Sequence, residues 1–137
     1  MKKIFLDANV LVDLIEDRQL EVTGVSNVKK LFPNTKLCIS ALSVHIAFYT
    51  LHIKPKTKKI ERVNRLLKYL KILPLTDTIV RPATKQNFHD FEDILQYFTA
   101  IYEDCDYILT RDKKDFSKIS KLIPSKTKII HHISQIK

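Results

Sequence analysis

The sequence contains a single glycine, Gly24. Walker loops and dinucleotide-binding fingerprints need several glycines, because the backbone must closely approach the phosphates of a bound nucleotide. The scarcity of glycine therefore excludes ATP-driven and NAD-dependent chemistry built on those loops. Long apolar runs are lacking too: no run approaches the ~20 residues that a membrane span needs, so we expect no membrane association.

Cysteine is also scarce. Cys38 and Cys105 stand far apart in apolar surroundings, and no Cys-x-x-Cys motif occurs, which predicts buried free thiols rather than a disulfide or a zinc site. The acid Asp7 comes too early for the apolar segment of a secretory signal, so we expect a cytoplasmic protein. The length of 137 residues, 45% of them hydrophobic, favours one folded domain over residues 1–137.

Positive charge, in contrast, is abundant. With 24 basic and 15 acidic side chains, the formal net charge is +9, which favours a polyanionic partner such as nucleic acid. A solvated, Lys-rich surface is an equally good interpretation. The densest basic stretch covers residues 54–71, and Lys59, Arg62 and Arg65 on its expected helix are candidate contacts for nucleic-acid phosphates.

Short apolar runs alternate with longer segments of helical spacing. We expect strands at residues 3–6, 36–40, 71–75, 107–110 and 128–131. Apolar side chains at steps of three and four predict helices between them, near residues 11–15, 41–53, 60–70 and 94–103. This alternation predicts a three-layer α/β/α fold with a mostly parallel sheet of about five strands. In such folds, ligands gather at the carboxyl ends of the strands.

Two aspartates directly follow expected strands. Asp7 comes after the first apolar run, and Asp112 comes after the run at residues 107–110. If these strands are parallel neighbours, both carboxylates emerge at one edge of the sheet. Asp is also a favoured N-cap, and for Asp7 alone helix capping is the better interpretation, with Asn9 as a further candidate cap.

Three more aspartates stand at expected helix starts. Asp90 and Asp93 precede the apolar helix near 94–103 with the spacing of a capping box, and acids in a first turn complement the helix dipole. Asp115 suits the N-cap of a short helix at residues 116–120. Each acid thus has a structural explanation when it is considered alone.

Considered together, the acids predict a cation site. Carboxylates gathered in one place repel one another and raise one another's pKa, unless a cation neutralises them. Ligands that offer only oxygen suit Mg²⁺ or Mn²⁺ rather than zinc, and such an ion can activate water for phosphodiester hydrolysis. The candidate catalytic and metal-binding residues are Asp7, Asp93 and Asp112.

Three segments together resemble the PIN-domain ribonucleases, the fold of the VapC-type toxins of bacterial toxin–antitoxin pairs. The opening segment, residues 4–14, is similar to the first strand of that family, with Asp7 at the place of its first metal acid and Asn9 at that of its usual polar neighbour. Residues 90–97 are similar to the entry of the helix that carries a later acid, here Asp93.

The third segment, residues 107–116, is similar to the family's strand-end motif, which usually reads Thr-Arg-Asn/Asp. Asp112 matches a site residue of that motif, with Thr110 and Asp115 as supporting residues. The candidate RNA contacts beside these acids are Arg111, Lys113 and Lys114. The resemblance implies a Mg²⁺-dependent endoribonuclease that forms a homodimer and is inhibited by a cognate antitoxin protein.

The segment 41–53 departs from the family. Many PIN domains carry an acid there, often a Glu, whereas this segment holds none and is apolar almost all round. His45 lies nearest the expected place, although a lone His on an apolar helix is more often a core or interface residue, and Glu92 is the other candidate for the missing charge. An apolar helix of this kind is either central or lies at a subunit interface, which favours a homodimer.

The missing acid keeps an alternative open, namely a catalytically weak or inactive PIN domain that acts as an RNA- or protein-binding module. Two other classes are disfavoured. A receiver domain needs an acidic pair after its first strand, where only Asp7 is found. A phosphatase of the Asp-x-Asp type is disfavoured because Asn9 stands at the place of the second acid.

Overall fold

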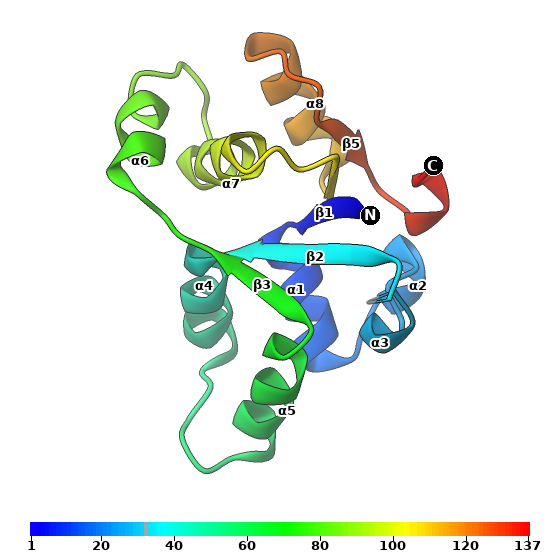
Figure 1. The fold of residues 1–137 in the computed structure, drawn as a ribbon. Coiled ribbons are helices and arrows are strands. Elements are labelled where there is room, and N and C mark those ends of the chain that lie inside the picture. The colour runs from blue at the N-terminus through cyan, green and yellow to red at the C-terminus, as the bar shows by residue number, and fades with distance from the viewer. Residues whose placement is uncertain (32) are drawn as a thin grey trace.

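A computed structural model of the chain describes residues 1–31 and 33–137 (Figure 1). Within them, one sheet contains the strands β1 (Lys2–Leu6), β2 (Thr35–Ser40), β3 (Leu70–Leu73), β4 (Tyr107–Leu109) and β5 (Lys128–Ile130). The strand order is β3-β2-β1-β4-β5, and every neighbouring pair is parallel. The predicted parallel sheet is therefore confirmed. The strand expected at 71–75 ends earlier, at Leu73, because Pro74 has no N–H to donate to a neighbouring strand.

Helices cover both faces of the sheet, as Figure 1 shows. On one face lie α1 (Ala8–Glu16), α2 (Leu20–Thr23), α3 (Val28–Leu31), α4 (Ala41–Leu51) and α5 (Lys58–Leu67). On the other lie α6 (Asp77–Ala83), α7 (Phe91–Tyr102) and α8 (Lys113–Leu122), and the chain ends after a short 3₁₀ helix, η1 (Ile133–Gln135). The predicted three-layer α/β/α architecture is confirmed.

The central strand β1 shows why both faces are covered. Ile4 and Leu6 belong to the core on the α1 side, whereas Phe5 between them belongs to the core on the α7 and α8 side. Alternate side chains of a strand point to opposite faces, so an unbroken apolar run needs helices on both sides. Cys38 and Cys105 are free, buried thiols in the second of these cores, as the sequence predicted.

The helix starts agree with the sequence at α7 and correct it at α8. Asp90 is the N-cap of α7, and its carboxylate accepts a hydrogen bond from the backbone N–H of Asp93 at 3.1 Å. The helix expected at 116–120 begins earlier, because Asp112 is its N-cap and accepts from the N–H of Asp115 at 3.3 Å. The prediction that Asp115 caps this helix was therefore wrong, and its carboxylate is not engaged as an N-cap.

Helix α4 is not central in the described part of the chain. Only Ser43 and Ala47 of this helix are buried, and Tyr49 keeps 77% of its surface exposed. Of the two interpretations of its apolar character, burial at the centre of the fold is excluded. In the described ranges, no helix combines the length and the apolarity that crossing a bilayer requires.

The order of the strands decides where a site can form. From β1 the chain continues to β2 and β3 on one side of the sheet, and from β4 it continues to β5 on the other side. The sheet therefore has its switch point between β1 and β4. Ligands of open parallel sheets bind at the carboxyl ends of the strands that flank such a point. There the N–H of Asp7 donates to the carbonyl of Leu109 at 3.0 Å, which joins the two strand ends.

Candidate active site

Asp7 and Asp112 leave the sheet side by side and are linked through Thr110. The buried hydroxyl of Thr110 donates to Oδ2 of Asp7 at 2.7 Å and accepts from the backbone N–H of Asp112 at 2.9 Å. The other carboxylate oxygen of Asp7 accepts from the N–H of Ala8 at 2.8 Å, which makes Asp7 the N-cap of α1. The capping and site interpretations of Asp7 are therefore compatible, because the side chain serves both.

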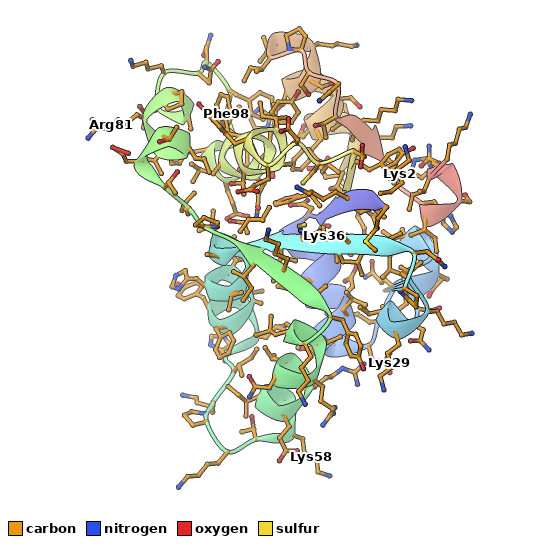
Figure 2. The ribbon with its side chains drawn as sticks, in the orientation of Figure 1. Lys2, Lys29, Lys36, Lys58, Arg81 and Phe98 are labelled. Carbon is orange, nitrogen blue, oxygen red and sulfur yellow. The ribbon has the colours of Figure 1, made fainter. Side chains whose placement is uncertain are left out.

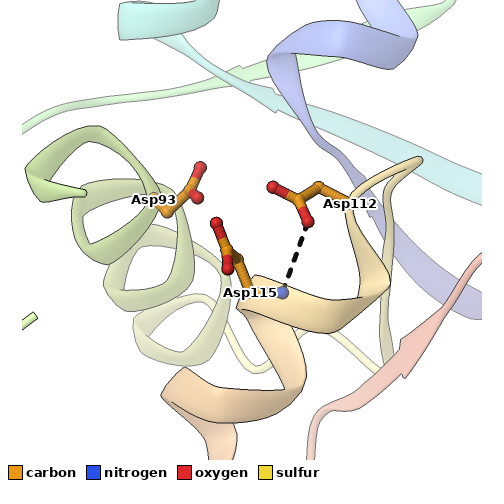
Figure 3. A group of neighbouring side chains, drawn as sticks. All are labelled: Asp93, Asp112 and Asp115. Carbon is orange, nitrogen blue, oxygen red and sulfur yellow. Dashed lines mark hydrogen bonds between the residues drawn. The ribbon is translucent and has the colours of Figure 1, made fainter. Parts of the chain in front are cut away.

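Two further carboxylates, from Asp93 and Asp115, face that of Asp112 beside this strand end (Figure 3). Asp93 comes from the first turn of α7, while Asp112 and Asp115 come from the start of α8. One oxygen from each of the three lies within 4.8 Å of the others. Asp93 is buried and the other two are half-buried. The packing of α7 against α8 thus brings together acids from two distant parts of the chain.

The carboxyls of Asp7 and Asp93 are both perturbed. Burial raises the pKa of Asp7 to about 6, against its hydrogen bonds with Thr110 and Ala8, which lower that pKa. Burial, together with the charges of Asp7, Asp90, Asp112 and Asp115, raises the pKa of Asp93 to about 8. The charge of Asp112 raises the pKa of Asp7, and the charge of Asp7 raises that of Asp93, so Asp7 lies near these two acids although it is outside the set within 4.8 Å.

The donor set fits a hard divalent cation. It offers only carboxylate oxygens, the ligand type that Mg²⁺ and Mn²⁺ prefer. Two of the carboxyls resist ionisation in the protein alone, because burial and neighbouring negative charge oppose it. A cation held among them would remove that opposition. Asp115, for which the sequence favoured a capping role, belongs to this acidic cluster of Asp93, Asp112 and Asp115.

Three other candidate supporting residues, Asn9, Glu92 and His45, are not part of the acidic cluster of Asp93, Asp112 and Asp115. Asn9 accepts from the N–H of Arg111 at 3.4 Å, so it braces the loop after β4. Glu92 is exposed, but its charge raises the pKa of Asp7. His45 is exposed on α4 and stacks on Tyr49, with ring centroids 6.4 Å apart. The structure does not bring His45 into the set of ligating groups found among the described residues.

The candidate RNA contacts fall into two groups. Lys113 and Lys114 are exposed on the first turn of α8, directly beside Asp112. The basic residues of α5 instead face α1: Lys59 pairs with Glu16 at 3.0 Å, and Arg62 pairs with Asp17 at 3.3 Å. Arg65 lines a cavity of about 260 Å³ between α5 and the segment around α3. Two of the three α5 candidates therefore already have acidic partners.

Two contacts near the site had no signal in the sequence. Arg111 pairs with Oδ2 of Asp13 at 2.7 Å, so this candidate RNA contact is anchored to a buried acid of α1. His89, in the loop before α7, brings Nε2 to 3.4 Å from Oδ2 of Asp115. Both pairs join residues far apart along the chain, and the sequence analysis assigned no role to Asp13 or His89.

With this geometry established, comparison with known proteins assigns the family. The chain belongs to the PIN-domain family, whose model matches residues 4–122. Ribonuclease VapC1 of Aquifex aeolicus is 31% identical over 123 residues, and the match covers 85% of each protein. The predicted resemblance is therefore confirmed.

Solved structures agree on the fold. VapBC2 of Rickettsia felis, bound to a DNA fragment from its promoter, matches with a TM-score of 0.66 at 19% identity, over 93% of this chain and 97% of that one. VapC20 of Mycobacterium tuberculosis, a toxin that cleaves the sarcin-ricin loop, matches with a TM-score of 0.61 at 15% identity, over 85% of this chain and 94% of that one.

Proposed function

We propose that this chain is a metal-dependent endoribonuclease of the VapC type, with one PIN domain over residues 1–137. The observation that carries the proposal is the convergence of Asp93, Asp112 and Asp115, with Asp7 beside them, at the switch point of the sheet. A relative at 31% identity is a ribonuclease, and VapC20 cleaves an RNA loop, which supports RNA as the substrate.

Each part of the site has a role in the proposed reaction. Asp7, Asp93 and Asp112 would hold Mg²⁺ or Mn²⁺, with Asp115 as a further oxygen ligand. The bound ion would supply an activated water and offset negative charge at the phosphate under attack. Thr110 and the N–H of Ala8 hold the Asp7 carboxylate in one orientation. Lys113 and Lys114 extend from the same edge and suit contacts with RNA phosphates.

We further propose the biological setting that VapC-type proteins suggest. The structural neighbour VapBC2 is a complex of toxin and antitoxin, which supports a cognate antitoxin as the partner of this chain. The exposed ring of Tyr49 on the apolar helix α4 supports a homodimer through this helix. The substrate and the absence of a bilayer-spanning helix among the described residues favour action in the cytoplasm.

The test is cleavage of RNA by the purified protein. We expect cutting with Mg²⁺ or Mn²⁺ and none with a chelator. Asp7→Asn and Asp93→Asn should each lower the rate by about 100-fold or more, because each removes a charge that holds the ion. The matched control is Asp104→Asn. Asp104 lies just before β4, at the amino end of that strand, and it pairs only weakly with Lys126 at 3.9 Å. Circular dichroism checks that all variants are folded.

Two results would contradict the proposal. Full activity in both site variants would place the chemistry elsewhere. Binding of RNA without cleavage at any metal concentration would instead identify the inactive binding module that the missing α4 acid suggests. Since Asp115 adds an oxygen ligand that the sequence had assigned to a helix cap, the active enzyme is the better-supported of the two.

A further inference from the structure

A shallow groove continues from the acidic cluster along α8. Its volume is about 610 Å³, and it is lined by Asn87, Phe88, His89, Lys118, Lys121 and Leu122. None of these residues is acidic, although the neighbouring cluster is. One wall is the loop before α7, and the other is the exposed face of α8. Nothing in the sequence motifs pointed to this surface.

The groove is physically continuous with the candidate active site. His89 is a lining residue, and its Nε2 lies 3.4 Å from Oδ2 of Asp115 in the cluster. On α8, Asp115, Lys118 and Leu122 follow one another at steps of three and four, so they share a helix face. An RNA segment bound over the cluster would therefore meet the groove at His89.

The chemistry of the groove suits a polyanion with flat rings. Lys118 and Lys121 are exposed, and neither has an acidic partner within 4.0 Å among the residues that the structure describes. This distinguishes them from Lys59 and Arg62 of α5, which are paired with acids of α1. Free lysines of this kind are available for phosphates.

The opposite wall of the groove offers aromatic surface. Phe88 and His89 lie with ring centroids 4.5 Å apart, and Phe88 is half-buried, packed against the core beneath α7. An anchored ring is a rigid platform on which an unpaired base can stack. Leu122, 57% exposed, extends the apolar floor at the far end.

We propose that this groove binds the single-stranded RNA segment that flanks the cleaved phosphodiester. The inference rests on the proposed ribonuclease function and names where its substrate lies. Lys118 and Lys121 contact phosphates, while Phe88 and His89 stack on bases. The helix from Asp115 to Leu122, eight residues, spans about 10 Å along its axis, which matches about three stacked nucleotides. The basic face of α5 has no role in this path.

The experiment measures the affinity for a short, unstructured, fluorescein-labelled RNA by anisotropy, in a chelator so that no cutting occurs. The groove variants are Lys118→Gln/Lys121→Gln and Phe88→Leu. The matched control is Lys2→Gln/Lys36→Gln, which removes the same charge. Both control lysines are exposed at the amino ends of their strands, away from α8 (Figure 2).

We expect the double groove variant to weaken binding about fivefold or more, and to reduce the slope of log affinity against log salt by about 1.4, the value for two lost phosphate contacts. Phe88→Leu should weaken binding about fivefold or more without changing that slope, because stacking is not ionic. The control should stay within about twofold of the parent chain.

The outcomes separate this inference from the proposed function. Groove variants that bind RNA as well as the control does would overturn the groove, even if the parent chain cuts RNA normally. A parent chain that does not bind RNA in the chelator would overturn it too. Loss of binding to an acidic peptide, with RNA binding unchanged, would assign the groove to a protein ligand. If the groove variants lose RNA binding but the parent chain never cuts RNA, the proposed ribonuclease function is wrong and the groove proposal stands.

Discussion

At the scale of single residues, the surroundings of Asp7 and Asp93 shift the pKa of their carboxyls to different extents. Asp7 is held by the hydroxyl of Thr110 and the N–H of Ala8, which favour its charged form, while burial favours the neutral form. Asp93 has neither of those donors and is surrounded by other acids, so its pKa rises more. The protein alone therefore holds a destabilising group at this position, and a bound cation would relieve the repulsion.

The shifted pKa of Asp93 predicts how stability changes with pH. The unfolded chain loses this proton near pH 3.8, whereas the folded, metal-free protein holds it to about pH 8. Between these values the unfolded state binds fewer protons, so the free energy of unfolding falls as the pH rises. Thermal melts in a chelator should show the Tm falling from about pH 5 to about pH 8.

The variant Asp93→Asn is the check on this cause, because it cannot ionise. It should melt higher than the parent chain at pH 8, by at least about 1 kcal/mol or roughly 3–5 °C, and its Tm should depend less on pH. Added Mg²⁺ should raise the Tm of the parent chain and have little effect on the variant. Equal pH profiles for the two proteins would show that Asp93 ionises freely.

At the scale of the elements, the scarcity of glycine leaves a mark on the backbone. Five described residues other than glycine have positive φ, and two of them, Asp17 and His52, are the C-caps of α1 and α4. Glycine adopts this conformation more readily than a residue with a Cβ. The one glycine, Gly24, has φ +79° and is packed against η1, so it meets two constraints at once.

Substitutions at Gly24 and at His52 should change the free energy of unfolding in opposite directions. A Cβ at Gly24 would lie 2.7 Å from Nε2 of His132 and 2.8 Å from Cγ1 of Ile133, so Gly24→Ala should lower the free energy of unfolding by about 2–3 kcal/mol. His52→Gly should raise it by about 0.5–1 kcal/mol, because it removes the strain at φ +50°. Urea titrations measure both, and a neutral Gly24→Ala would contradict the close contact with η1.

At the scale of the whole molecule, basic and large apolar side chains are both spread over the surface. Basic side chains such as Lys2, Lys29, Lys58 and Arg81 project in several directions, as Figure 2 shows, so the net charge of +9 is not gathered in one patch. Exposed large apolar side chains also lie on several elements, and among the described residues Tyr49 of α4, 77% exposed, exceeds all of them but Met1. A general attraction for polyanions and one specific protein contact are the expected consequences.

The proposed homodimer is tested at Tyr49. Tyr49→Lys should convert a dimer to a monomer in sedimentation or light-scattering measurements, because it places a charge in an apolar contact. Tyr102→Lys is the matched control, since Tyr102 is also an exposed tyrosine but belongs to α7. A parent chain that is monomeric at high concentration, or a dimer that survives Tyr49→Lys, would exclude α4 as the interface.

Much of this structure was predictable, and the failures have identifiable causes. The strands were found because buried parallel strands are continuous apolar runs. The short helices α2, α3 and α6 were not predicted, since segments of four to seven residues are too short to show a helical period. The start of α8 was misplaced because Asp112 and Asp115 are equally good caps by residue type.

The candidate site was likewise predicted only in part from the sequence. Asp7, Asp93 and Asp112 were named from their places at strand ends and a helix start, and the structure gathers them at one sheet edge. Asp115 was named as a supporting residue and belongs to the cluster, whereas the contacts of Arg111 with Asp13 and of His89 with Asp115 were not predicted. Each depends on the direction of a side chain relative to a distant helix.

By itself, the sequence determined the layer architecture and the edge of the sheet at which the acids gather, because apolar periodicity and strand order along the chain are local properties. Only the tertiary structure decided which carboxylates share a site, which cations are already paired and where a groove continues from the acids. The physical reason is that these features depend on how α7, α8 and α5 pack. Contacts between residues tens of positions apart set that packing, and no local pattern records it.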